Sequence, residues 1–187
     1  MMNKLKYFFI IVLLFFSSVT TGYKKPPVIT IDAVNNANMH NNLGLLYLED
    51  RIYYAAIQEF KIAISLNPNS QTSATYYNNL GKTYLIIGYP DLAQDCFERA
   101  ISQYPLDFSF YDNLAQTYLL MNIAQVKLRH YSKSDLYPQN RIMSGLLNVK
   151  LGNIKQGIII LDEFCSKEPD LKLTPGVKKY IESIQVP

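Results

Sequence analysis

Two short neighbouring segments place apolar and small residues at helical spacing. Leu43, Gly44 and Tyr47 fall on one face of a first helix, and Ala56 and Phe60 fall on one face of a second. The small residues let the two backbones approach closely, while the Tyr and Phe rings fill the space beside that contact. The pattern therefore predicts a hairpin of two helices packed through these faces.

The same pattern occurs a second time, 37 residues further along the chain. Proline lacks an amide donor and restricts the residue before it, so Asn67-Pro68 and Tyr104-Pro105 are expected to end the second helix of each hairpin. Eight positions agree in type and spacing between the two copies. In the first copy they are His40, Leu43, Gly44, Tyr47, Ala56, Phe60, Ala63 and Pro68. In the second copy they are Tyr77, Leu80, Gly81, Tyr84, Ala93, Phe97, Ala100 and Pro105.

Two further hairpins are more divergent. In the third, Leu114-Ala115 stands where the others have Leu-Gly, and the second helix is degenerate within residues 124–134, so this hairpin should be shorter. A fourth begins near Pro138 and has its turn at residues 151–153. Apolar residues at helical spacing within residues 175–184 then predict a capping helix.

This motif resembles the tetratricopeptide repeat family, whose unit has an aromatic residue, Leu-Gly, Tyr, Ala, Phe and Pro at these offsets. The resemblance implies an all-α fold, a right-handed superhelical array of about four helix-turn-helix hairpins with a C-terminal capping helix. We expect a leader at residues 1–22, an extended tether at 23–36, repeats at 37–70, 74–107, 108–137 and 138–171 (together 37–171), and the cap at 172–187.

The N-terminal segment has the layout of a secretory signal peptide. Lys4 and Lys6 precede an uncharged run at residues 7–19, and small polar residues follow as far as Gly22. The run of 13 residues is shorter than the ~18 expected of a membrane-spanning helix. We therefore expect an exported protein, periplasmic or otherwise extracytoplasmic, with a signal anchor that keeps residues 7–19 in the membrane as the alternative to cleavage.

Charge argues against a nucleic-acid ligand. The formal net charge is +3, and removal of Lys4 and Lys6 with the leader leaves +1, whereas nucleic-acid-binding domains are strongly basic. The charge is uneven, with six basic and nine acidic residues from Lys24 to Asp112 but ten basic and five acidic residues from Lys127 to Lys179. This asymmetry could orient a partner, or it could reflect solvated faces alone.

No group of residues indicates catalysis, a metal site or a cofactor. His40 takes the place of a packed aromatic residue, His130 has no metal-ligand partner at a suitable spacing, and there is no Gly-rich phosphate loop or nucleophile motif. Cys96 and Cys165 lie two repeats apart, beyond the reach of a disulfide, so we expect free packed thiols rather than a redox pair. We predict no catalytic residues, no metal and no cofactor.

The first helix of each repeat has polar residues on the side opposite the packed face. In the family this helix lines a concave groove, so the resemblance implies a site for a peptide or protein partner there. An amide both donates and accepts hydrogen bonds, which suits an extended peptide backbone, or it could brace neighbouring helices instead. The predicted groove residues are Asn38, Asn41, Asn42, Asn78, Asn79, Lys82, Asn113 and Gln116.

Some family members hold the C-terminal carboxylate of a chaperone with a clamp of lysines, an arginine and asparagines. This sequence has Asn41 and Leu45 at the first-repeat clamp positions, Ser109 and Asn113 at the third-repeat ones, and only Asn79 agrees. Without cationic donors the charge-assisted hydrogen bonds to a carboxylate are lost, so we expect no such clamp at these positions.

These observations favour an exported scaffold or adaptor that binds a peptide or protein. An assembly factor or chaperone of a cell-envelope machine, of the type used in pilus or outer-membrane biogenesis, is the alternative. An enzyme is a third possibility that no residue constellation supports.

Overall fold

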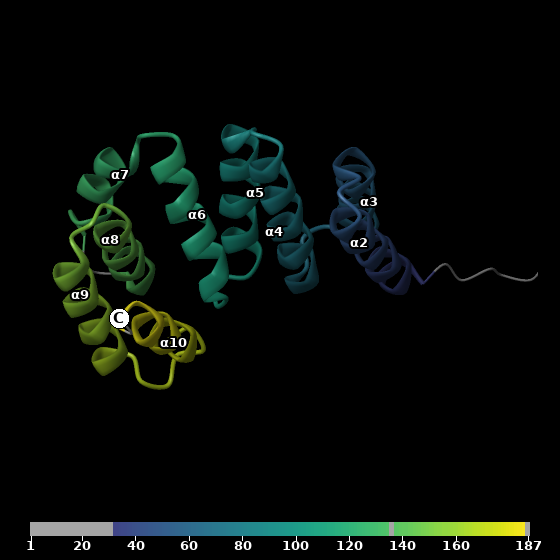
Figure 1. The fold of residues 1–187 in the computed structure, drawn as a ribbon. Helices are drawn as coiled ribbons and strands as arrows, with labels where there is room; N and C mark the ends of the chain where they lie inside the picture. Colours follow the sequence, from purple (N-terminus) through teal and green to yellow (C-terminus); the bar gives the residue numbers. More distant parts are fainter. Residues whose placement is uncertain (1–31, 135–136, 186–187) are drawn as a thin grey trace, which may run out of the picture. The chain divides into compact units, whose positions relative to one another are not determined.

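A computed structural model describes residues 32–134 and 137–185. Within these ranges the chain is helical with short turns and has no β-strand (Figure 1). The predicted leader, and the tether up to residue 31, lie outside the described residues. The helices are α2 (Ala33–Glu49), α3 (Tyr53–Leu66), α4 (Gln71–Ile86), α5 (Pro90–Gln103), α6 (Phe108–Leu120), α7 (Ala124–Tyr131), α8 (Pro138–Lys150), α9 (Ile154–Lys167) and α10 (Thr174–Gln185).

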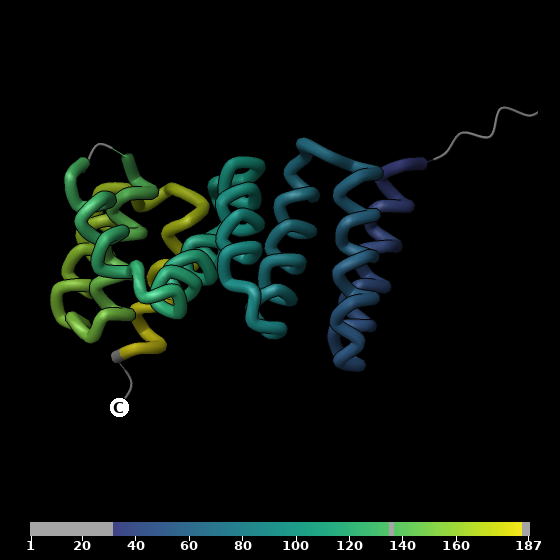
Figure 2. The backbone as a smooth tube through the Cα atoms, turned by 90° about the horizontal axis from the view of Figure 1, so that it is seen from above, coloured from purple at the N-terminus to yellow at the C-terminus, as the bar shows by residue number. Residues whose placement is uncertain are grey.

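The helices form consecutive hairpins that pack on one another in chain order. Extensive contacts join α2 with α3, α4 with α5 and α8 with α9, and each of the first two hairpins packs on the next through α3 against α4 and α5 against α6. The two views in Figures 1 and 2 show this succession of antiparallel pairs. The repeat array expected from the sequence is thus confirmed.

All four hairpins turn in the same way, although two of them are divergent in sequence. One residue in each turn has a positive φ: Arg51 at 61°, Gly88 at 84°, Asn122 at 58° and Gly152 at 88°. The amide of the following residue then donates to a carbonyl near the end of the first helix, as in Ile52 to Tyr47 at 2.7 Å. This bond closes a left-handed helix cap, and the equivalent bond is present in the other three hairpins.

Small residues set the spacing between the helices of a hairpin, as the sequence predicted. A Cβ atom added to Gly44 would lie 2.6 Å from Cε1 of Phe60, and one added to Gly81 would lie 2.8 Å from Cε1 of Phe97. Both Phe rings are fully buried. In the fourth hairpin Gly145 is in the same relation to Leu161, at 2.6 Å. The backbones could not come this close with larger side chains at the glycine positions.

The start of the first helix corrects one expectation. We expected an extended tether as far as residue 36, but α2 begins at Ala33, and residues 33–36 are helical. The reason is a helix cap, because the Asp32 carboxylate accepts a hydrogen bond from the backbone amide of Asn35 at 3.0 Å. The polar composition of this stretch concealed the helix start.

Leu43 is less packed than its position in the motif suggested. It is 37% exposed, whereas Leu80 and Leu114 at the same position of the next repeats are 4% and 2% exposed. Leu80 is buried because the preceding hairpin packs on α4 through α3. No described helix precedes α2, so its outer side, which includes Val34 and Leu46, remains exposed.

The third hairpin is shortened, as expected, and this changes the packing around it. α7 has eight residues and makes few contacts with α6, while both α6 and α7 pack against α8. The polar atoms left in this region pair with one another, since the Tyr118 hydroxyl donates to Glu98 Oε1 at 3.0 Å. Lys127 Nζ lies 4.5 Å from the centre of the Tyr118 ring.

The remaining fold-level predictions concern the cap and the thiols. α10 packs mainly on α9 and buries Val177 and Ile181, in agreement with the predicted capping helix. Cys96 and Cys165 are buried free cysteines. None of the helices within residues 32–134 and 137–185 combines the length and apolar character needed to cross a membrane.

Candidate partner-binding surface

Asparagine side chains join the first helices of successive repeats. Asn79 Nδ2 donates to Asn41 Oδ1 at 2.9 Å, and Asn113 Nδ2 donates to Asn78 Oδ1 at 2.8 Å. The donor and acceptor stand at the same repeat positions in both bonds, so one interaction links α2 to α4 and its counterpart links α4 to α6. We call the side of α2, α4 and α6 that carries these bonds the amide face.

The amide face divides the predicted groove residues into two groups. Asn41, Asn78 and Asn79 are each only 8% exposed, so the prediction that packing leaves this side of the helices free is wrong for these three. The contact between successive repeats covers them, which favours the bracing interpretation for this group. The other predicted residues are exposed or half-buried, namely Asn38, Asn42, Lys82, Asn113 and Gln116.

The exposed amides keep free hydrogen-bonding capacity beside the buried bridges. Asn38 Oδ1 accepts a bond from the Tyr76 hydroxyl at 2.6 Å, which leaves its amide NH₂ group for other partners. Asn42 is exposed next to the Asn41 bridge, and Lys82 is exposed one turn beyond Asn78. The face can therefore offer donors, acceptors and one cation from positions that the bridges hold in register.

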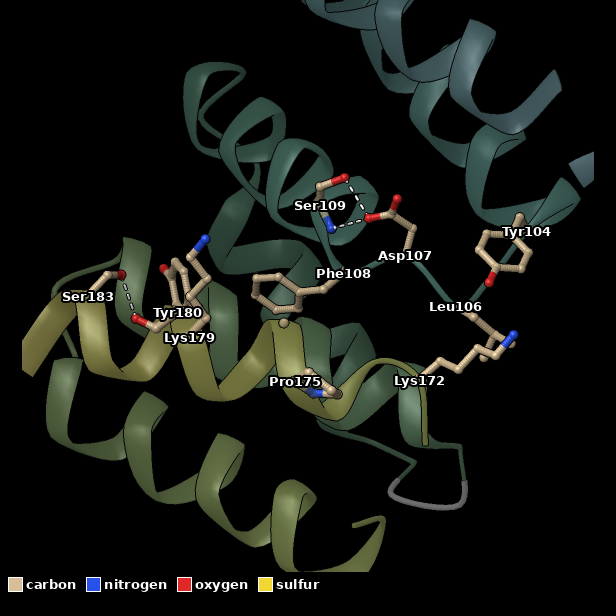
Figure 3. A pocket seen from close by; sticks show the side chains of 11 residues that line it. Tyr104, Leu106, Asp107, Phe108, Ser109, Lys172, Pro175, Lys179, Tyr180 and Ser183 are labelled. Carbon is tan, nitrogen blue, oxygen red and sulfur yellow. Dashed lines mark hydrogen bonds between the residues drawn. The ribbon is translucent and has the colours of Figure 1, made fainter. Parts of the chain in front are cut away.

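A pocket of about 770 Å³ lies between the start of α6 and the capping helix α10 (Figure 3). Ser109, which has the same repeat position as Asn38 and Thr75, lines it, so the pocket borders the amide face. Its volume is within the range of small-molecule and peptide side-chain sites. The apolar part of its lining consists of Tyr104, Leu106, Phe108, Pro175, Gly176 and Tyr180.

Close packing of α10 on α6 forms the floor of this pocket. The rings of Phe108 and Tyr180 are tilted at 53° with centroids 5.4 Å apart. A Cβ atom added to Gly176 would lie 2.7 Å from Cβ of Phe108, so the glycine permits the close approach of the helices. Burial, together with the nearby Asp112 carboxylate, raises the pKa of Tyr180 to about 12, so the phenol is neutral at physiological pH.

Among the described residues, some charged side chains at and below the pocket have hydrogen-bond or ion-pair partners and others do not. The Asp107 carboxylate caps α6, since its Oδ1 accepts from the Ser109 amide at 2.9 Å and from the Ser109 hydroxyl at 2.7 Å. Below the floor, Lys150 pairs with Asp112 at 2.7 Å. In contrast, no ion pair within residues 32–134 and 137–185 engages Lys172 or Lys179, and both side chains are exposed.

Sequence reasoning missed this pocket, because it joins residues more than 60 positions apart. The available signals were Phe108, an aromatic residue at the start of the third repeat, and Gly176, a glycine within the capping helix. Neither one indicates a pocket until α10 is placed against α6. Of the pocket-lining residues, Ser109 was named from the sequence, because it stands at a clamp position of the third repeat.

Each of the two histidines contacts a neighbouring side chain. His40 Nδ1 lies 2.6 Å from Glu59 Oε2, which joins α2 to α3. The His130 ring meets the neighbouring Tyr131 edge to face, with centroids 5.3 Å apart. In the part of the chain that the structure describes, no cluster of three or more His, Cys, Asp or Glu side chains could hold a metal ion.

Comparison with known proteins agrees with this geometry. Residues 74–105 match the model of a family described as tetratricopeptide repeat. A crystal structure of MamA is similar with a TM-score of 0.50 and 22% identity, over 72% of this chain and 80% of that chain. A structure of PilF from Pseudomonas aeruginosa is similar with a TM-score of 0.50 and 16% identity, over 79% of this chain and 68% of that chain.

At these identities the two structures show a shared fold. The family match covers the second hairpin, α4 and α5, which is the copy that agrees best with the repeat pattern. No curated protein matches the sequence significantly.

Proposed function

We propose that this chain is an exported scaffold that holds a peptide or protein partner against the amide face. Its second hairpin matches the tetratricopeptide repeat family, whose members generally act as scaffolds that bind peptides or proteins, and its fold is shared with solved structures of similar repeat proteins. The observation that carries this proposal is the row of exposed and half-buried polar side chains beside the amide bridges. The groups that would contact the partner are those that the packing leaves accessible: Asn38, Asn42, Lys82, Asn113 and Gln116.

The bridges support this role by fixing the spacing of the exposed groups. A partner that meets a preorganised row of donors and acceptors loses less free energy to ordering the protein than one that must order it. Asn41, Asn78 and Asn79 would then act through the positions of their neighbours. Lys82 adds a cation near the middle of the face, which would favour a partner segment with an acidic side chain at that point.

Site-specific photo-crosslinking tests the location of the partner. A photoreactive amino acid at position 42 should capture a protein in the cells that produce this chain, and the same amino acid at position 58 should not. Gln58 is exposed on α3, the second helix of the same hairpin, so the two sites share local stability but differ in face. Capture from position 58 alone would place the partner elsewhere and remove the proposal.

Export is the second part of the proposal, supported by Lys4, Lys6 and the uncharged run at residues 7–19. The chain expressed in a secreting host should leave the cytosol. If the leader is cleaved after Gly22, N-terminal sequencing should find Tyr23 first, whereas an intact Met1 in the membrane fraction identifies a signal anchor. Recovery of all the protein in the cytosol would contradict both forms.

A further inference from the structure

The pocket between α6 and α10 has an aromatic floor and two lysines that form no ion pair with any residue the structure describes. Lys172 precedes the capping helix, and Lys179 lies within it. In Figure 3 the Lys172 side chain is drawn toward Leu106 and Tyr104, and Lys179 is beside Tyr180 near the other end. An apolar floor thus has one positive charge toward each end.

The one acidic side chain in the lining does not neutralise these cations. Asp107 accepts two hydrogen bonds from Ser109 at the start of α6, where the partial positive charge of the helix end offsets its negative charge. The segment that supplies both lysines belongs to the basic part of the chain, since residues 127–179 have ten basic and five acidic residues. A ligand that placed its own carboxylates near Lys172 and Lys179 would complement this charge.

The size and lining of the pocket restrict the ligand further. About 770 Å³ accommodates a bulky side chain with part of the backbone on either side of it. Phe108 and Tyr180 offer ring faces and edges, against which an aromatic or large aliphatic side chain would pack. The Ser109 side chain, exposed at the start of α6, is placed to meet the backbone of such a segment.

We propose that this pocket binds an extended peptide segment in which one aromatic or large aliphatic residue is flanked on both sides by acidic residues. This inference rests on the proposed function, because it names the chemistry of the partner segment that the scaffold would hold. The cations come from the capping segment and not from the repeat helices, so the site differs from the carboxylate clamp that the sequence lacks. It predicts that specificity lies at the C-terminal end of the array.

Peptide selection on the full chain, purified in mild detergent, tests the proposal. The probe is a random dodecapeptide library displayed on phage. Selected sequences should be enriched in an aromatic or large aliphatic residue with Asp or Glu on both sides. Synthetic copies should bind about tenfold more weakly to the variant Lys172→Glu/Lys179→Glu, because two attractive pairs become repulsive. Raising the salt concentration should weaken binding to the unchanged chain.

The matched control is Lys155→Glu/Lys178→Glu, which changes net charge by the same amount. Both control lysines are exposed and neither lines the pocket. The control should bind the selected peptides like the unchanged chain, and both variants should melt at the unchanged temperature, since all four side chains are on the surface.

The outcomes separate this inference from the proposed function. If the selected peptides bind the Lys172→Glu/Lys179→Glu variant as well as the unchanged chain, or lack acidic residues, this inference is wrong and peptide binding stands. If the control variant loses binding equally, the effect is one of net charge and the pocket assignment is also wrong. If no peptide is enriched, this inference is wrong, while the proposed function is decided separately by photo-crosslinking from position 42.

Discussion

Replacing Asn79 by Ala should destabilise the protein, because the buried Asn41 side chain loses its hydrogen-bond donor. The bond from Asn79 Nδ2 to Asn41 Oδ1 is 2.9 Å long, and both side chains are 8% exposed. Without the donor, the Asn41 oxygen stays buried and unpaired, which costs about 1 to 3 kcal/mol. In a chain of this size each kcal/mol lowers the melting temperature by about 2 to 4 °C.

A double-mutant cycle isolates the bond itself. Asn41→Ala combined with Asn79→Ala removes both polar groups, so no buried atom is left unpaired by the loss of this bond. The double variant should then lose less stability than the sum of the two single variants, by about 0.5 to 1.5 kcal/mol. Guanidinium unfolding followed by circular dichroism measures all four chains under one condition. Strict additivity would show that the bond contributes nothing and would refute the bracing interpretation.

Asn42→Ala is the matched control, because Asn42 stands on α2 at the same repeat position as Asn79 on α4 but is exposed. Its stability should stay within about 0.5 kcal/mol of the unchanged chain. The two positions should also differ in binding. For the partner captured from position 42, Asn42→Ala should weaken affinity more than Asn79→Ala does when both are measured well below the melting temperature, because Asn79 acts only through the positions of its neighbours. A larger loss of affinity from Asn79→Ala than from Asn42→Ala would show that Asn79 contacts the partner directly.

Three further predictions concern packing and protonation. Gly81→Leu should destabilise the array by about 1 to 3 kcal/mol in a thermal melt, because even a Cβ atom would lie 2.8 Å from Phe97, while Lys82→Leu next to it should have little effect. Burial raises the pKa of the Cys96 thiol to about 12, so iodoacetamide should modify this thiol at pH 8 only after the chain unfolds. Mass spectrometry measures the modification, and rapid modification of the folded chain would contradict the prediction. Because the pKa of Tyr180 is higher in the folded than in the unfolded chain, its neutral phenol contributes to the free energy of unfolding below pH 10. This contribution is lost as the pH rises toward 12, since the unfolded phenol releases its proton first. Denaturant midpoints that do not fall between pH 10 and 12 would contradict this prediction.

The sequence by itself determined the repeat architecture. The packing within a hairpin joins residues close together in the sequence, as in the pairs Gly44–Phe60 and Gly81–Phe97. The spacing of such pairs is visible in the sequence. The exits at Pro68 and Pro105 are local too, because proline restricts its own neighbours. The same reasoning found the capping helix and the shortened third hairpin, since each rests on periodicity within about a dozen residues.

Tertiary structure decided which polar residues are accessible and where a pocket forms. Asn41, Asn42, Asn78 and Asn79 look alike in sequence, yet only Asn42 is exposed, because the contact between successive repeats covers the others. That contact depends on how one hairpin is rotated against the next, which no single repeat encodes. The pocket likewise required α10 to pack on the start of α6, which brings together residues far apart in the chain and places the cations of the capping segment over a floor built partly by the third repeat.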